Sequence, residues 1–215
     1  GTDAAAILRL AENRRNDPAW QSSPVIPCAA AQALISVGWA PAALTLLAQV
    51  RADFPAAIRP RQLTGLALAR SCNWKEARAV LGDLYELGER DPETIGIYAR
   101  TWMDAYQAKG ERAMLQRSRN LYAEGFAIAP KEYFLGINAA AKSIFLGEID
   151  AGSRYAQAVE QLVGTQPVSA NYWQSATVAE VQLIQRNFDV AATLYEQAVA
   201  MAPGVYECVP SVISP

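Results

Sequence analysis

The sequence predicts an all-α protein, an α-solenoid of about five helical hairpins preceded by one capping helix. Three observations lead to this fold class. Small residues recur at twelve-residue intervals, prolines close several of the apolar segments, and valine and isoleucine recur at helical intervals rather than alternating as in a strand. With 215 residues, of which 52% are hydrophobic, the chain is large enough to bury a substantial core.

The first elements are expected in the following order. A helix over residues 3–15, from the segment DAAAILRLAENRR, caps the array, and the turn-rich segment NDPAWQSSPVIP forms a link. The first hairpin covers residues 24–57, where Ala31 and Ala43 stand twelve apart and Pro55 closes the unit. The second covers residues 58–91, where Gly65 and Ala77 keep the same interval.

The third hairpin, over residues 92–130, is irregular. Its small residues Gly96 and Ser118 are twenty-two positions apart rather than twelve, and we expect the additional residues to lengthen the loop around QAKGERAM. The fourth hairpin covers residues 131–165 and sets Ala140 against Gly152, with a GEID turn between the helices. The fifth covers residues 172–205, and a proline-rich tail over residues 206–215 follows it.

The fifth hairpin shows most clearly why this spacing predicts a helix pair. Small Ala179 and Ala191 stand twelve apart and are followed by Tyr195, Ala198 and Pro203. Small residues let the two helices of a hairpin approach, the aromatic residue fills the space between hairpins, and proline ends the second helix. The spacing resembles the tetratricopeptide repeat (TPR), a helix-turn-helix unit of about 34 residues. In such arrays the first helix of each pair lines a concave groove.

Three segments carry a more specific resemblance, namely ETIGIYARTWMD, LYAEGFAIAPKEYFLGINAAA and NYWQSATVAEVQLIQRNFDVAATLYEQAVAMAPGVYE. In order and spacing they resemble the central regulatory domain of the apoptosis signal-regulating kinases and its bacterial relatives, the TRAF-binding or sensor-type TPR domain. The matching residues are Gly96, Arg100, Asp104, Tyr122, Gly125, Phe126, Tyr133, Gly136, Asn138, Ala139, Asn171, Tyr172, Trp173, Ala198 and Pro203.

The resemblance implies a regulatory scaffold or sensor that signals to a protein partner or to an attached effector domain. For the bacterial relatives it also implies a nucleotide-derived ligand. It implies no kinase activity, because the sequence has no Gly-rich phosphate loop and no HRD or DFG motif. Because the chain begins with Gly1, we expect it to be a fragment of a longer protein.

Composition and charge exclude several classes of function. A net charge of −2 and a pI near 5.3 provide no basic field for nucleic acid or an anionic membrane, and no apolar run is long enough to span a bilayer. The absence of histidine excludes Ser-His-Asp and Cys-His catalysis and the commonest zinc ligand. Cys28, Cys72 and Cys208 are widely spaced and form no CxxC pair. We therefore expect a cytoplasmic protein without catalytic residues, metal or cofactor.

The segment 93–104 holds the first candidate site. On a helix Glu93, Arg100 and Asp104 fall within about 40° of one another, opposite an apolar face, and in repeat register they turn toward the groove. They are either a ligand-binding cluster or a solvated face with a weak Arg100–Asp104 pair. Gly96 serves either close helix packing or the approach of a ligand to bare backbone.

Other candidates lie in the neighbouring units. Arg59, Gln62 and Arg70 turn toward the same groove, where the arginines could add to a positive patch for carboxylate or phosphate, or be ordinary solvated charges. Asn138 and Lys142 stand four apart among apolar residues, so they bind a ligand or make a structural hydrogen bond to an adjacent loop. Tyr172 and Trp173 either stack on a base or peptide or pack between repeats.

These residues predict a non-catalytic binding or regulatory module. Its groove would hold a small anionic ligand, such as a nucleotide-derived one, or an acidic peptide, and would relay binding to a partner or to an attached effector domain. The alternative is a purely structural scaffold for protein–protein assembly, which could include a homodimer formed through the convex face or the tail.

Overall fold

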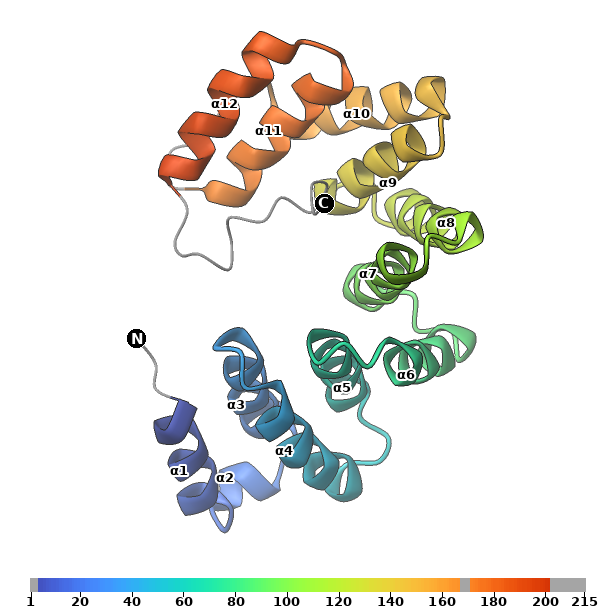
Figure 1. Cartoon of the computed structure of the whole chain (residues 1–215). Helices are drawn as coiled ribbons and strands as arrows, with labels where there is room; N and C mark the ends of the chain where they lie inside the picture. Colours follow the sequence, from blue (N-terminus) through green and yellow to red (C-terminus); the bar gives the residue numbers. More distant parts are fainter. Residues whose placement is uncertain (1–3, 167–170, 202–215) are drawn as a thin grey trace. The chain divides into compact units, whose positions relative to one another are not determined.

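The computed structural model describes residues 4–166 and 171–201, and the regular elements in these ranges are all α-helices (Figure 1). The chain falls into two compact units, Gly1–Lys109 and Gly110–Pro215, and each is described by itself. The boundary between them lies within the predicted third hairpin. That the whole chain acts as one domain stays a prediction.

Unit 1 is built from helices that pack in sequential pairs. α3 packs against α4, α5 packs against α6, and the first helices α3, α5 and α7 contact one another in succession. α1 packs against α3 at the start of the array. The helices are α1 (Ala4–Arg14), α2 (Pro18–Gln21), α3 (Val25–Ser36), α4 (Ala40–Asp53), α5 (Ile58–Arg70), α6 (Trp74–Glu86) and α7 (Pro92–Lys109).

Unit 2 follows the same plan. α9 pairs with α10 and α11 with α12, while α8 packs against α9 and the first helices α9 and α11 contact each other. Its helices are α8 (Arg112–Ile128), α9 (Tyr133–Phe145), α10 (Ile149–Val163), α11 (Tyr172–Ile184) and α12 (Phe188–Ala200). The predicted all-α class of helical hairpins is thus confirmed.

The segment NDPAWQSSPVIP, expected as a turn-rich link, contains α2, a single turn that Asp17 caps by accepting a hydrogen bond from Ala19 N at 2.9 Å. One local expectation was wrong. The additional residues of the third hairpin were expected to form a loop, yet α8 begins three positions after α7 ends. They extend the helices, to 18 and 17 residues, because Gly110 is the only helix breaker among strong helix formers.

Five helices end in the same left-handed turn. Gly38, Gly88 and Gly147 adopt φ values between 81° and 90° after α3, α6 and α9. Cys72 and Arg186 take the equivalent place after α5 and α11, with φ of 59° and 67°. In each case the next backbone N–H donates to the carbonyl five residues earlier, as in a Schellman motif.

Small residues allow the two helices of a hairpin to pack closely, as the twelve-residue spacing suggested. A Cβ atom on Gly65 of α5 would lie only 2.5–2.9 Å from three side-chain carbons of Leu81 on α6. A Cβ atom on Gly152 of α10 would lie 3.1 Å from the carbonyl oxygen of Ala140 on α9. Both helix pairs therefore approach too closely for a larger residue.

Within the described ranges, none of the helices combines the length and the apolar character that crossing a bilayer requires. The predicted tail over residues 206–215, with Cys208, and the closing Pro203 lie outside the described residues.

Candidate functional site

A polar network surrounds Arg59 on the first helices of unit 1. Its Nη1 lies 2.5 Å from Glu93 Oε2 on α7 and donates to Gln62 Oε1 at 3.3 Å, while Nη2 donates to Gln32 Oε1 on α3 at 3.0 Å. Arg59 therefore links α3, α5 and α7. The Arg59 and Glu93 side chains keep 33% and 47% of their surface exposed, so a ligand can reach the pair.

The buried part of this network fixes the start of α7. Gln62 Nε2 donates to Asp91 Oδ2 at 3.1 Å and to Thr94 Oγ1 at 2.7 Å. Asp91 Oδ1 accepts from the backbone N–H groups of Glu93 and Thr94, at 3.0 and 3.2 Å, and so caps the helix. These hydrogen bonds tie α5 to α7 beneath the exposed Arg59–Glu93 pair.

Sequence reasoning did not select Gln32, Asp91 or Thr94. A signal for Asp91 was present, because aspartate directly before proline is typical of a helix N-cap followed by the first helical position. Gln32 carried no such signal, since only the packing of α3 against α5 brings it to Arg59.

The structure brings together three of the predicted groove residues, Arg59, Gln62 and Glu93. Arg100 and Asp104 form a separate pair one turn apart on α7, in which Arg100 Nε donates to Asp104 Oδ1 at 2.8 Å. Both arginines thus already hold a carboxylate partner. Gly96 is buried in α7, and the related Arg70 is exposed at the end of α5.

In unit 2 the predicted pair Asn138 and Lys142 meets in the core between helices. Lys142 is fully buried, donates from Nζ to Asn138 Oδ1 at 2.5 Å, and lies 5.1 Å from the centre of the Tyr122 ring. Asn138 Nδ2 donates to the Phe134 carbonyl at 2.8 Å. The described partners of Asn138 therefore belong to its own helix, and not to an adjacent loop as the structural alternative expected.

Glu180 of α11 interacts electrostatically with Lys142 and was missed by sequence reasoning. It is buried, and the loss of solvation raises the pKa of its carboxyl to about 8, although the charge of Lys142 acts in the opposite direction. Among the described residues its Oε1 has no hydrogen-bond partner. The signal in the sequence was a single charge inside the apolar run VAEV.

The charge of Glu180 also acts on Tyr195 of α12. Burial, and then the Glu180 charge, raise the pKa of the Tyr195 hydroxyl, which has no hydrogen-bond partner in the described part of the chain. The cluster of Asn138, Lys142, Glu180 and Tyr195 is therefore a polar centre inside unit 2, held by α9, α11 and α12.

The two aromatic candidates of unit 2 differ in accessibility. The ring centres of Tyr172 and Trp173 are 5.0 Å apart at 70°, an edge-to-face contact. Tyr172 is buried, while Trp173 is 51% exposed, so only Trp173 offers a face to a ligand. Of the cysteines in the described ranges, Cys28 is buried, which raises the pKa of its thiol, and Cys72 is exposed.

Residues 39–143, just under half of the chain, match the family model described as Tetratricopeptide Repeats-Sensor. No curated protein matches the chain. One similar solved structure is a thermophilic TPR protein of Thermus thermophilus, at 16% identity over 86% of this chain and 95% of that chain, with a TM-score of 0.69. Yeast Tom70 matches at 11% identity over 99% of this chain and 42% of that chain, with a TM-score of 0.65.

A third similar structure is YrrB, described as a TPR protein with an unusual peptide-binding site. It matches at 11% identity over 96% of this chain and 97% of that chain, with a TM-score of 0.53. At these identities the similar structures establish the fold. The chain therefore has the fold of tetratricopeptide-repeat proteins, and its residues 39–143 are similar to the sensor-type model.

Proposed function

We propose that this protein is a non-catalytic interaction module whose unit 1 binds a carboxylate or phosphate group at Arg59. The group would belong to an acidic peptide of a protein partner or to a small anionic ligand, such as a nucleotide-derived one. The observation that carries the proposal is the position of Arg59, whose guanidinium contacts residues of α3, α5 and α7 and remains partly exposed. A guanidinium fork matches such anions in a bidentate manner.

An arriving anion competes with Glu93 for Arg59. The exposed pair is inexpensive to open, since such pairs contribute about 0–1 kcal/mol. The exchange releases Glu93 and removes one direct tie between α5 and α7, while the buried bonds among Gln62, Asp91 and Thr94 hold. Because neighbouring repeats couple through their interfaces, binding shifts the packing of α7 on α5. This shift is the proposed relay to a partner or an attached effector domain.

Calorimetric titration with ATP and with an acidic peptide tests this proposal through changes of opposite sign. Arg59→Ala removes the anion's partner, so affinity falls by about tenfold. Glu93→Gln removes the competing carboxylate, so affinity rises by about threefold or more. Arg154→Ala serves as the control, because Arg154 is exposed on α10 of unit 2. If both unit 1 variants change affinity in the same direction, the proposed competition between Glu93 and the anion is contradicted. If neither variant changes affinity, Arg59 is not the binding site.

The relay needs a second measurement. Exchange of the backbone amides in the first turn of α7, from Glu93 onward, should increase when the anion binds wild type. The same segment should already exchange faster in Glu93→Gln without ligand, since the tie from Arg59 is absent. Binding without any change in exchange at this segment would leave recognition standing and remove the relay.

A structural scaffold is a second candidate, favoured by apolar residues on the surface of α12. Phe188 and Val199 are 61% and 57% exposed, and eleven positions on a helix place them within about 20° of each other. Such a stripe suits assembly with another protein or a second copy of the chain. Sedimentation of wild type and Phe188→Asp tests the homodimer. A stoichiometric partner whose binding survives Arg59→Ala but not Phe188→Asp would favour this candidate.

A further inference from the structure

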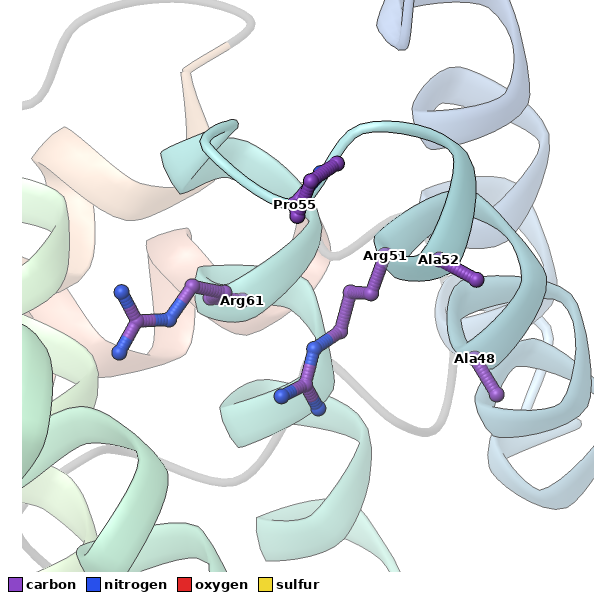
Figure 2. Close-up of a pocket in the computed structure, with 5 residues that line it drawn as sticks. All are labelled: Ala48, Arg51, Ala52, Pro55 and Arg61. Carbon is purple, nitrogen blue, oxygen red and sulfur yellow. The ribbon is translucent and has the colours of Figure 1, made fainter.

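A pocket of about 520 Å³ lies where α4 ends and α5 begins in unit 1. Figure 2 shows Arg51 and Ala52 on the last turn of α4, Ala48 one turn earlier, Pro55 on the connection and Arg61 on the first turn of α5. This volume is within the usual range for ligand sites, about 300–1,000 Å³. Arg59 and Arg61 are two positions apart on α5, about 200° around the helix, so the pocket is on another face than the Arg59 network.

The lining combines a small apolar floor with two cations. Ala48, Ala52 and Pro55 leave space because their side chains are short, and all three are exposed. Both charged residues among the five that line the pocket are arginines. A ligand here therefore meets apolar surface at the floor and positive charge at the edge.

Neither arginine is neutralised by its surroundings. Arg59, Arg100 and Arg119 each have a carboxylate within 3.0 Å, whereas Arg51 and Arg61 have no ion pair or hydrogen bond with any described residue. Arg61 also stands in the first turn of α5, which has no acidic residue. Cations are disfavoured at that end of a helix. An anion in the pocket would offset the unfavourable interaction between the Arg61 charge and the start of α5.

We infer that this pocket binds an acidic peptide segment, with its backbone and aliphatic stems on Ala48, Ala52 and Pro55 and with separate carboxylates on Arg51 and Arg61. The two guanidinium groups extend in different directions (Figure 2), so groups spaced along a chain can satisfy both where one compact anion cannot. The open, exposed floor suits an extended segment rather than an enclosed small molecule. The inference does not depend on anion binding at Arg59.

Fluorescence anisotropy with a labelled peptide of about ten residues, alternating Asp and Ser, tests the inference. Wild type should bind it, and the matched Asn-Ser peptide should bind at least about tenfold more weakly, because the amide carries no charge for the guanidinium groups. Arg51→Ala and Arg61→Ala should each weaken binding by about threefold, and the double variant by about tenfold. Affinity should fall as salt concentration rises, as for exposed charges.

Matched variants separate this site from the Arg59 network. Arg154→Ala removes an exposed arginine of α10 in unit 2 and should leave affinity unchanged. The Arg51→Ala/Arg61→Ala protein should keep the anion binding that depends on Arg59, which Arg59→Ala removes. Failure of one site can therefore be told from failure of the other. Far-UV circular dichroism should remain that of wild type, because Arg51 and Arg61 make no described contact that the fold needs.

Three results would overturn the inference. They are failure of the Asp-Ser peptide to bind wild type, equal affinity of wild type and the double variant, and equal affinity of the Asp-Ser and Asn-Ser peptides. Inorganic phosphate and ATP are the competing arms. Either ligand could displace the peptide at concentrations below the peptide's own dissociation constant and lose affinity in the double variant. The pocket would then bind phosphate rather than an acidic peptide.

Discussion

Lys142 of α9 and Glu180 of α11 are both buried in unit 2, and the charge of the lysine lowers the pKa of a carboxyl that burial raises. The loss of solvation is the larger effect, so the carboxyl binds its proton more tightly in the folded protein than in the unfolded chain. Burial, and then the Glu180 charge, also raise the pKa of the Tyr195 hydroxyl.

Stability should therefore fall as pH rises from about 5 to 8. In this window the folded protein keeps a proton on Glu180 that the unfolded chain, with a pKa near 4.5, has released, and each pH unit costs at most about 1.4 kcal/mol. The chain has no histidine to titrate in the same range. Urea unfolding across this range should show the decline in wild type and a flatter profile in Glu180→Gln. The same slope in both proteins would falsify the assignment.

Lys142→Met should destabilise the protein more at pH 9 than at pH 6, because above the Glu180 pKa of about 8 it removes the counter-charge of a buried carboxylate. The double variant Lys142→Met/Glu180→Leu should recover most of that loss, since apolar residues can replace a buried pair. A double-mutant cycle from urea midpoints measures the coupling. Additive effects of the two substitutions would show that the side chains do not act on each other.

Gly65→Ala should destabilise unit 1 by about 1–3 kcal/mol, because its Cβ would meet the buried Leu81 side chain at 2.5–2.9 Å. Gly82→Ala on α6 is the matched control. The nearest atom there is the Tyr98 hydroxyl oxygen at 3.3 Å, at the end of its side chain, so helix propensity should make this change neutral or stabilising by up to about 1 kcal/mol. Thermal unfolding should show a lower midpoint for Gly65→Ala and an unchanged or higher midpoint for Gly82→Ala.

Arg186→Gly should stabilise the protein by about 0.5 kcal/mol or more. Arg186 is exposed and holds φ at 67°, a conformation that costs a non-glycine residue about 1–2 kcal/mol and glycine almost nothing. Part of the gain is lost to the greater freedom of glycine in the unfolded chain. Gly147→Ala is the reverse experiment, at the equivalent turn after α9, and should destabilise. A lower unfolding midpoint for Arg186→Gly would contradict the strain at this turn.

The repeat plan could be read from the sequence because it depends on short-range spacing. Small residues must recur where two helices touch, and Gly152 does lie against Ala140 as that spacing suggested. The length of the α7–α8 connection could not be read in this way. The repeat interval shows how many residues the third hairpin has in excess, but it does not show their conformation. Because these residues favour helix, they lengthen α7 and α8.

The candidate sites were predicted only in part. Repeat register placed Arg59, Gln62 and Glu93 on one surface, and they do meet. Repeat register does not show whether an arginine already forms an ion pair, because that depends on how far side chains extend between helices. Nor could it show that Glu180 is buried, since the sequence does not state which faces of α11 neighbouring helices cover.

The burial of Lys142 gives the protein an internal reporter of its own opening. The chain has four lysines, and Lys75, Lys109 and Lys131 are exposed while Lys142 is fully enclosed. An amine-acetylating reagent should modify the first three quickly, but should reach Lys142 only when α9 separates from its neighbours. The acetylation rate of that one peptide, followed by mass spectrometry, therefore measures how often unit 2 opens in the unaltered protein.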